Sequence, residues 1–121
     1  MDDSNTTIAQ LKKIVKAHCE ERDWDQYHNS KDLAIGASIE ASELLEHFIY
    51  KSGEEINEIL SNPKKLGEIK DEMSDILFYI LRLAQMNNID LSTAFNAKMD
   101  QNRKKYPVSK AKGSNKKYNE L

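Results

Sequence analysis

Residues 62–86, NPKKLGEIKDEMSDILFYILRLAQM, decide the fold of this chain. Asn62 is a typical N-cap, and Pro63 suits the first helical position because the N–H that proline lacks has no partner there. The apolar residues that follow recur at spacings of three and four: Leu66, Ile69, Met73, Ile76, Leu77, Ile80 and Ala84. The stretch therefore predicts a long amphipathic helix that ends near residues 87–88.

Similar signals predict further helices on both sides of this stretch. Threonine, asparagine or aspartate caps precede the expected helices, Ser52-Gly53 ends the second of them, and Pro107 ends the last. The expected helices cover about residues 6–21, 30–50, 54–60 and 90–105, and the remainder is expected to be irregular. The chain has no internal repeat, glycine-rich phosphate loop or cleanly alternating strand, so the predicted fold is all-α, a small bundle of four to five helices.

The size of the chain limits what it can contain. Its 121 residues and 13.9 kDa suit one domain, predicted over residues 1–107 and followed by a basic tail over residues 108–121. A monomer of this size buries only about two-thirds of its unfolded surface. Because the apolar face of residues 62–86 is also wide, we expect a homodimer or homotetramer.

Charge and cysteine content bear on partners and compartment. The net charge of −2 divides into +6 over residues 98–121 and −8 over residues 1–97. The acidic part would repel a nucleic acid, whereas the basic part suits a short polyphosphate, unless it is simply solvated. A single Cys19, an acidic start without a signal-peptide pattern and the lack of a long apolar run predict a cytoplasmic protein without a membrane partner.

Two pairs of carboxylates border the apolar faces. Helical periodicity places Glu72 and Asp75 beside the apolar arc of residues 62–86, and Glu40 and Glu43 beside that of residues 30–50. Carboxylates that lose hydration together cannot all stay ionised without a cation. Mg²⁺ is the cation that these carboxylates are expected to bind, with Mn²⁺ as a possible substitute. The alternative interpretation is that the carboxylates lie on ordinary solvated helix faces and bind no metal.

A di-iron site is excluded by the histidines. Such a bundle uses Glu-x-x-His pairs, and none of His18, His28 and His47 follows a glutamate by three residues.

Four segments in order carry a resemblance to a known family. They are WDQYH at 24–28, EASELLE at 40–46, DEMSDILFY at 71–79 and KMDQNRKKYP at 98–107. Together they resemble the all-α nucleoside triphosphate pyrophosphohydrolases of the MazG type, in particular the dCTP pyrophosphatase branch. The resemblance implies an all-α fold and Mg²⁺-dependent hydrolysis of the α–β phosphoanhydride of a nucleoside triphosphate.

The resemblance also implies roles for individual residues. Glu40, Glu43, Glu72 and Asp75 would hold the metal. The residues that would contact the nucleotide are Trp24, His28, Tyr50, Tyr79, Lys98, Asn102, Arg103, Lys105 and Tyr106. Among them, Lys98, Arg103, Lys105 and Tyr106 would contact the phosphates. Tyr50 stands where deoxycytidine-specific members carry tryptophan, but it keeps an aromatic face. Glu43 is the candidate general base because its side chain leaves the apolar arc towards the expected pocket.

The resemblance suggests dCTP or a modified pyrimidine nucleotide as the substrate, in a role of cleaning the nucleotide pool. Two alternatives stay open at this point. The same chemistry could act on another base, such as that of dUTP. The chain could also be a non-catalytic helical adaptor whose apolar face binds a partner.

Overall fold

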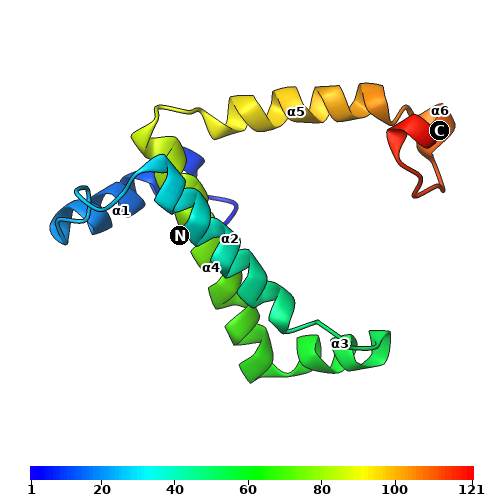
Figure 1. Cartoon of the computed structure of the whole chain (residues 1–121), viewed down its shortest axis with the longest axis horizontal. Coiled ribbons are helices and arrows are strands. Elements are labelled where there is room, and N and C mark those ends of the chain that lie inside the picture. Colours follow the sequence, from blue (N-terminus) through cyan, green and yellow to red (C-terminus); the bar gives the residue numbers. More distant parts are fainter. The chain divides into compact units, whose positions relative to one another are not determined.

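The computed structural model describes residues 1–121 and consists of helices without any strand (Figure 1). The helices are α1 (Ile8–Glu21), α2 (Ser30–Glu46), α3 (Gly53–Ser61), α4 (Pro63–Met86), α5 (Leu91–Lys105), α6 (Val108–Ala111) and the 3-10 helix η1 (Tyr118–Glu120). Contacts divide the chain into two units, Met1–Asn88 and Ile89–Leu121, and each unit is described by itself. The predicted all-α class is confirmed.

The first five helices begin where the sequence predicts because polar side chains cap them. The N-caps are Thr7, Asn29, Ser52, Asn62 and Asp90, and each accepts a hydrogen bond from a backbone N–H three residues later. Such a cap contributes about 1 kcal/mol to helix stability. The starts of these helices are therefore local properties of the sequence.

Two boundaries differ from the prediction. Helix α2 ends at Glu46 and not near residue 50, because the backbone N–H groups of His47 and Phe48 bond three residues back and tighten the chain into turns. The prediction that Ser52-Gly53 ends this helix is wrong, because Ser52 caps α3 and Gly53 is its first residue. Part of the expected irregular tail is helical, since the N–H groups of Lys110 and Ala111 both bond to the carbonyl of Pro107 and begin α6. The predicted domain boundary at residue 107 stays a prediction.

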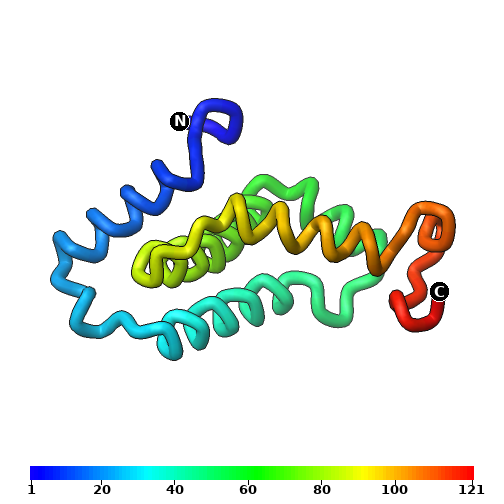
Figure 2. The backbone as a smooth tube through the Cα atoms, turned by 90° about the horizontal axis from the view of Figure 1, so that it is seen from above, coloured from blue at the N-terminus to red at the C-terminus, as the bar shows by residue number.

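Helix α4 organises the first unit. Figures 1 and 2 show α2 running alongside it, and α1 and α3 also contact it. The buried side chains and the buried glycine of this unit come from α1, α2 and α4: Val15, Cys19, Leu33, Gly36, Ile69, Leu81, Arg82 and Ala84. This packing turns the acidic edges of α2 and α4 towards each other.

None of the helices combines the length and the apolar composition that crossing a bilayer requires.

Candidate metal and nucleotide site

Three of the predicted metal ligands meet where α2 packs on α4. Glu40 and Glu43 lie on one face of α2 because they are three residues apart, and Glu72 faces them from α4. One carboxylate oxygen from each residue lies within 4.8 Å of the others. Asp75, one turn further along α4, is outside this group of three, but its charge acts on Glu40. We call Glu40, Glu43, Glu72 and Asp75 the acidic cluster.

The electrostatics of the acidic cluster fit a cation. Oε2 of Glu40 and Oε2 of Glu72 are buried without a hydrogen-bond partner. The pKa of Glu40 is raised by a hydrogen bond with Glu43, then by burial and by the negative charges of Glu43, Asp75 and Glu72. Buried carboxylate oxygens without partners are costly, and hard divalent cations prefer oxygen ligands of this kind. The residues present therefore suit Mg²⁺ or Mn²⁺.

His47 adds a contact that the sequence analysis did not assign. Its Nε2 lies 3.8 Å from Oε1 of Glu72, and the two side chains are only 15% and 20% exposed. The distance permits an ion pair when His47 is protonated but is too long for a hydrogen bond. Its position one turn after Glu43, directly after the last residue of α2, was the available sequence signal.

Trp24 and His28 lie in the connection between α1 and α2, residues 22–29. The backbone N–H of Trp24 bonds to the carbonyl of Cys19 at 2.9 Å, and that of His28 bonds to the carbonyl of Trp24 at 3.2 Å. The two rings have centroids 6.1 Å apart. Trp24 is 37% exposed, and His28 is half-buried. The structure thus brings these two predicted pocket residues together on one short connection.

Tyr79 lies against α2 at Gly36. A Cβ atom on Gly36 would come within 2.4 Å of Cε1 of Tyr79, so only glycine allows this approach. Tyr79 is half-buried there, one turn of α4 beyond Asp75. The aromatic ring is therefore held at the interface that also carries the acidic cluster.

Replacing Gly36 by alanine is expected to displace the Tyr79 ring. Overpacking of this kind costs about 1–3 kcal/mol of unfolding free energy. If Tyr79 walls the nucleotide pocket, KM for the nucleotide also rises. Thermal unfolding and steady-state kinetics measure both effects, and Gly67→Ala is the matched control because its added Cβ meets nothing within 4 Å. Equal behaviour of the two variants would contradict the prediction.

Tyr50 lies in the connection between α2 and α3. It follows α2 with a positive φ of 61°, and its side chain is 96% exposed. Its predicted stacking role stays a prediction.

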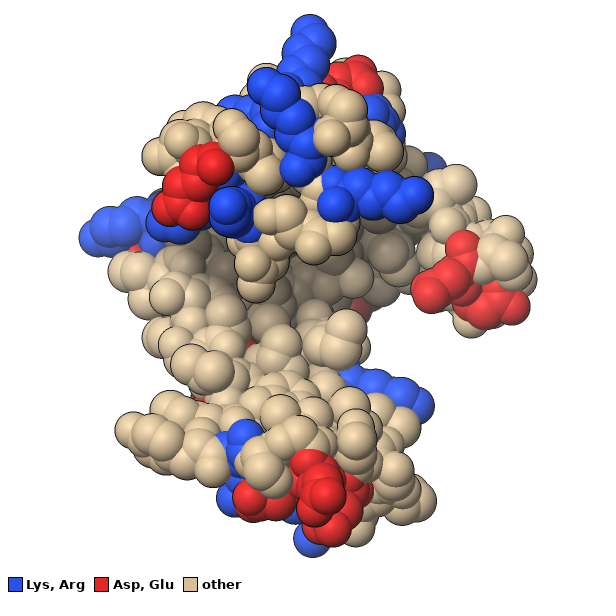
Figure 3. All heavy atoms as spheres, turned by 90° about the vertical axis from the view of Figure 1, so that its right-hand side faces the viewer, with Lys and Arg blue, Asp and Glu red and all other residues tan.

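The remaining predicted residues belong to the second unit. Lys98, Asn102 and Lys105 follow one face of α5 at helical spacing, and Lys105 Nζ lies 5.0 Å from the ring centroid of Tyr118. Arg103 pairs with Asp100, and the rings of Tyr106 and Tyr118 meet edge to face. Figure 3 shows lysine and arginine side chains on the surface of this unit, at the top of the view. Their approach to phosphates stays a prediction.

Arg82 is the buried charged residue that the sequence analysis missed. It is only 1% exposed, and it bonds to Asp25, His28 and Gln85. The available signal was a cation within the apolar run ILFYILRLA, on the part of α4 that packs in the core.

Comparisons with known proteins agree with the resemblance. Residues 35–121 match the MazG-like family. The chain is 36% identical over 118 residues to dCTP pyrophosphatase 1 of Bos taurus, covering 98% of this chain and 70% of that protein. It is 34% identical over 115 residues to dCTP pyrophosphatase 1 of Homo sapiens, covering 95% and 68%.

A solved structure shows that the fold is also similar to that of a pyrophosphatase. The crystal structure of a pyrophosphatase from Archaeoglobus fulgidus superimposes with a TM-score of 0.77 at 35% sequence identity, covering 88% of this chain and 98% of that chain. Because the related proteins are enzymes, the adaptor alternative is set aside. The chain belongs to the MazG-like family and is an enzyme of the nucleoside triphosphate pyrophosphohydrolase class.

Proposed function

We propose that this enzyme hydrolyses the α–β phosphoanhydride of dCTP or a modified pyrimidine nucleotide, in a role of cleaning the nucleotide pool. The products are the nucleoside monophosphate and pyrophosphate. The observation that carries the proposal is the acidic cluster, with its two buried and unpartnered carboxylate oxygens on Glu40 and Glu72. The likeness to dCTP pyrophosphatases supports the choice of base.

The chemistry follows from the residues of the acidic cluster. Glu40, Glu43, Glu72 and Asp75 would hold Mg²⁺, which would supply neutralisation of the phosphate charge and a lowered pKa for the attacking water. Glu43 is exposed, so its carboxylate can accept the proton of the attacking water. The water oxygen bonds to the α-phosphorus, and the bond from that phosphorus to the bridging oxygen breaks. No covalent intermediate with the protein is needed.

Other side chains would position the nucleotide. Trp24 and Tyr79 supply aromatic faces for the base, and His28 supplies a polar contact. By resemblance to the family, we propose that Lys98, Arg103 and Lys105 complement the charge of the leaving pyrophosphate.

A nucleotide panel tests the proposed function. The enzyme is incubated with Mg²⁺ and each of dCTP, dUTP, dTTP, dATP and dGTP, and pyrophosphate and orthophosphate are measured separately. We expect dCTP to react fastest and to release one pyrophosphate per turnover. Orthophosphate as the primary product would show cleavage at a different bond. Faster turnover of dUTP would favour the alternative base.

Magnesium is expected to stabilise the folded enzyme. A ligand that binds only the folded state at a hundred times its Kd adds about 2.7 kcal/mol. That energy corresponds to a rise in Tm on the order of 10 °C for a chain of this size. Thermal unfolding with and without Mg²⁺ measures the shift, and Glu40→Gln should reduce it. An unchanged Tm would contradict a metal site here.

The stabilisation of the folded enzyme by Mg²⁺ should depend on pH. The pKa of Glu40 lies above its ordinary value of 4.5 in the folded protein. Without metal, the contribution of Glu40 to the free energy of unfolding is therefore fully present below pH 4.5. It is lost as the pH rises through the raised pKa of Glu40. Protons compete with the metal at low pH. The Tm difference caused by Mg²⁺ should thus be larger at pH 7.5 than at pH 5.

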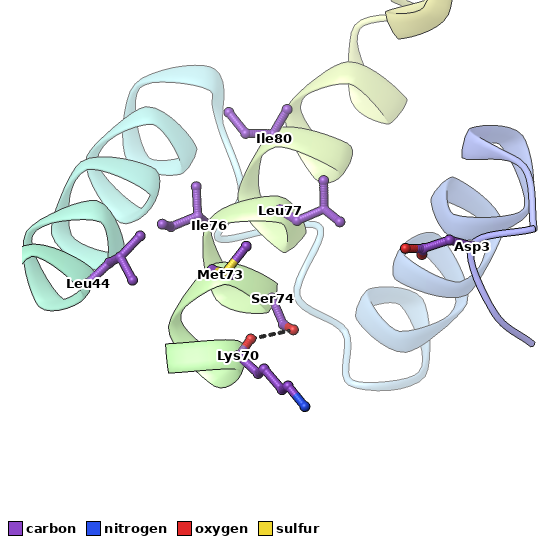
Figure 4. A pocket seen from close by; sticks show the side chains of 8 residues that line it. All are labelled: Asp3, Leu44, Lys70, Met73, Ser74, Ile76, Leu77 and Ile80. Carbon is purple, nitrogen blue, oxygen red and sulfur yellow. Dashed lines mark hydrogen bonds between the residues drawn. The ribbon is translucent and has the colours of Figure 1, made fainter. Parts of the chain in front are cut away.

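We also propose a homodimer or homotetramer. An apolar groove of about 780 Å³ lies on α4 and is lined by Met73 and Leu77 of α4 and by Leu44 of α2 (Figure 4). Met73 is 57% exposed and Leu77 is 43% exposed. Exposed apolar patches of this kind mark protein interfaces, and a second copy of the chain is the expected occupant.

Light scattering tests the oligomer. The wild type should give two or four times the chain mass of 13.9 kDa at micromolar concentration. Leu77→Glu should shift the protein to the monomer, whereas Lys64→Glu, an exposed position of α4 outside the groove, should not. A fully active wild-type monomer would refute the proposal.

A further inference from the structure

Arg82 ties the connection between α1 and α2 to helix α4. Its Nε–H donates to Nδ1 of His28 at 2.9 Å, and its Nη1 donates to Oε1 of Gln85 at 2.5 Å. Its Nη2 donates to Oδ1 of Asp25. The Arg82 side chain is 2% exposed and that of Asp25 is 54% exposed, so the cation is buried while its counter-ion reaches solvent. One guanidinium thus holds two residues of the connection from more than 50 positions away in sequence.

The hydrogen bond to His28 determines the state of the imidazole. A guanidinium always carries its protons, so the nitrogen that accepts from it is unprotonated. The imidazole is then neutral, with its proton on Nε2, on the side of the ring away from Nδ1.

The charged surroundings of His28 agree with this state. Burial and then the positive charge of Arg82 lower the pKa of His28, and the negative charge of Asp25 opposes them. On the α1 side, His18 packs edge-on against Trp24 with ring centroids 5.4 Å apart. The hydrogen bond from Arg82 of α4 therefore sets the orientation of the His28 ring, and the charge of Arg82 adds to burial in keeping the ring neutral.

We propose that Arg82 is a positioning residue of the base pocket, which fixes the His28 ring so that Nε2–H donates to a hydrogen-bond acceptor on the pyrimidine. This inference rests on the proposed function, in which His28 faces the base. Carbonyl O2 and ring N3 of cytosine are acceptors of the required kind. A donor that is held in place before binding loses less entropy on contact, so Arg82 acts on affinity more than on the chemical step.

The test uses Arg82→Met in the full chain. Methionine fills much of the buried space, and Asp25 can hydrate because it is already half exposed. We expect KM for dCTP to rise by up to about tenfold, the upper end of what one neutral hydrogen bond contributes, with kcat changed less than about threefold. Gln85→Leu is the matched control, because it removes another partner of Arg82 and leaves the bond to His28. Its KM should stay within about threefold of the wild type.

A second readout follows the imidazole directly. Nitrogen chemical shifts of His28, measured by NMR across pH, should show a neutral Nε2–H ring in the wild type down to a lower pH than in Arg82→Met. The ratio of KM in the variant to KM in the wild type should then depend on pH between about 5.5 and 7.5, and the ratio cancels titration of the nucleotide itself. A purely structural Arg82 would lower Tm without moving either quantity.

A double-mutant cycle tests whether Arg82 affects KM through His28. If Arg82 acts through His28, then Arg82→Met should add little to the KM of His28→Ala. Additive effects, or an unchanged His28 titration in Arg82→Met, would overturn the proposal. An unchanged KM in His28→Ala would also overturn the proposal for Arg82. Hydrolysis of dCTP by the wild type would then still support the proposed function.

Two further results keep the test decisive. Should Arg82→Met fail to fold, Arg82→Lys replaces it, because an ammonium keeps the charge but lacks the planar fork that reaches Asp25 and His28 together. Its KM should rise in the same direction, and a wild-type KM would overturn the proposal. A wild type inactive on every nucleotide contradicts the proposed function instead, and the titration of His28 still decides the ring-fixing step.

Discussion

Replacing Glu72 by glutamine is expected to lower kcat/KM by at least about a thousandfold at saturating Mg²⁺ while the helical fold survives. Asp75→Asn should act in the same direction. Each substitution keeps the shape of the side chain and removes a negative charge that would help to hold the metal, and the metal would neutralise the charge that develops on the phosphates. The effect should appear in kcat as well as in metal affinity, since the α–β phosphoanhydride would be cleaved at the site that these carboxylates form.

The stability of these variants carries independent information. Glu72 is one of the negative charges that raise the pKa of Glu40. Removing one charge from a like-charged cluster relieves repulsion, so Glu72→Gln should be at least as stable as the wild type in metal-free buffer. Its Tm should respond less to Mg²⁺ than that of the wild type.

Glu68→Gln is the matched control for both measurements. Glu68 lies one turn earlier on α4, where it pairs with Lys65 at 3.4 Å, outside the acidic cluster. It should keep nearly full activity. Near wild-type activity of Glu72→Gln or Asp75→Asn at saturating Mg²⁺ would show that the residue concerned is not a metal ligand. Loss of activity together with unfolding would be detected by circular dichroism.

The second large effect concerns the base. We expect the wild type to prefer dCTP over dATP by at least about a hundredfold in kcat/KM, because mismatched polar groups of a wrong base leave buried partners unpaired. Trp24→Ala should reduce this preference to about tenfold or less. Stacking of a base on an aromatic ring is worth about 1–3 kcal/mol by alanine substitution, and the loss falls mainly on the nucleotide that fits the pocket.

Tyr27→Ala is the control for Trp24→Ala. Tyr27 lies on the same connection and is 67% exposed, and it is not among the predicted pocket residues. Its selectivity should match that of the wild type. Comparable kcat/KM values for dCTP and dATP in the wild type would refute the base assignment, although pyrophosphate release would still support the class of reaction.

The helix starts and the helix faces of this chain follow from local sequence, because they depend on interactions between residues only three or four positions apart. A polar side chain bonded to an N–H three residues later starts each long helix, as at Asn62 and Lys65, so the starts of the helices could be predicted. The spacing of three residues likewise places Glu40 beside Glu43 on any α-helix. The four ordered segments were sufficient to indicate the family, which the match over residues 35–121 confirms.

Helix ends were less predictable than helix starts. Helix α2 stops at Glu46 because successive backbone N–H groups bond three residues back, and no glycine or proline marks that point. The short α6 likewise depends on two N–H groups that share the carbonyl of Pro107. These choices depend on small differences between competing backbone hydrogen bonds, which residue patterns do not resolve.

The sequence by itself determined the helical class, the helix starts and the amphipathic edges that carry the acids. Only the tertiary structure decided that Glu72 of α4 comes within 4.8 Å of Glu40 and Glu43, and that Gly36 admits the ring of Tyr79. It also decided that Arg82 bonds to Asp25 and His28, 57 and 54 residues away. Helical periodicity gives the face of a residue within its own helix, whereas the residue opposite it depends on how two helices align when their apolar faces pack.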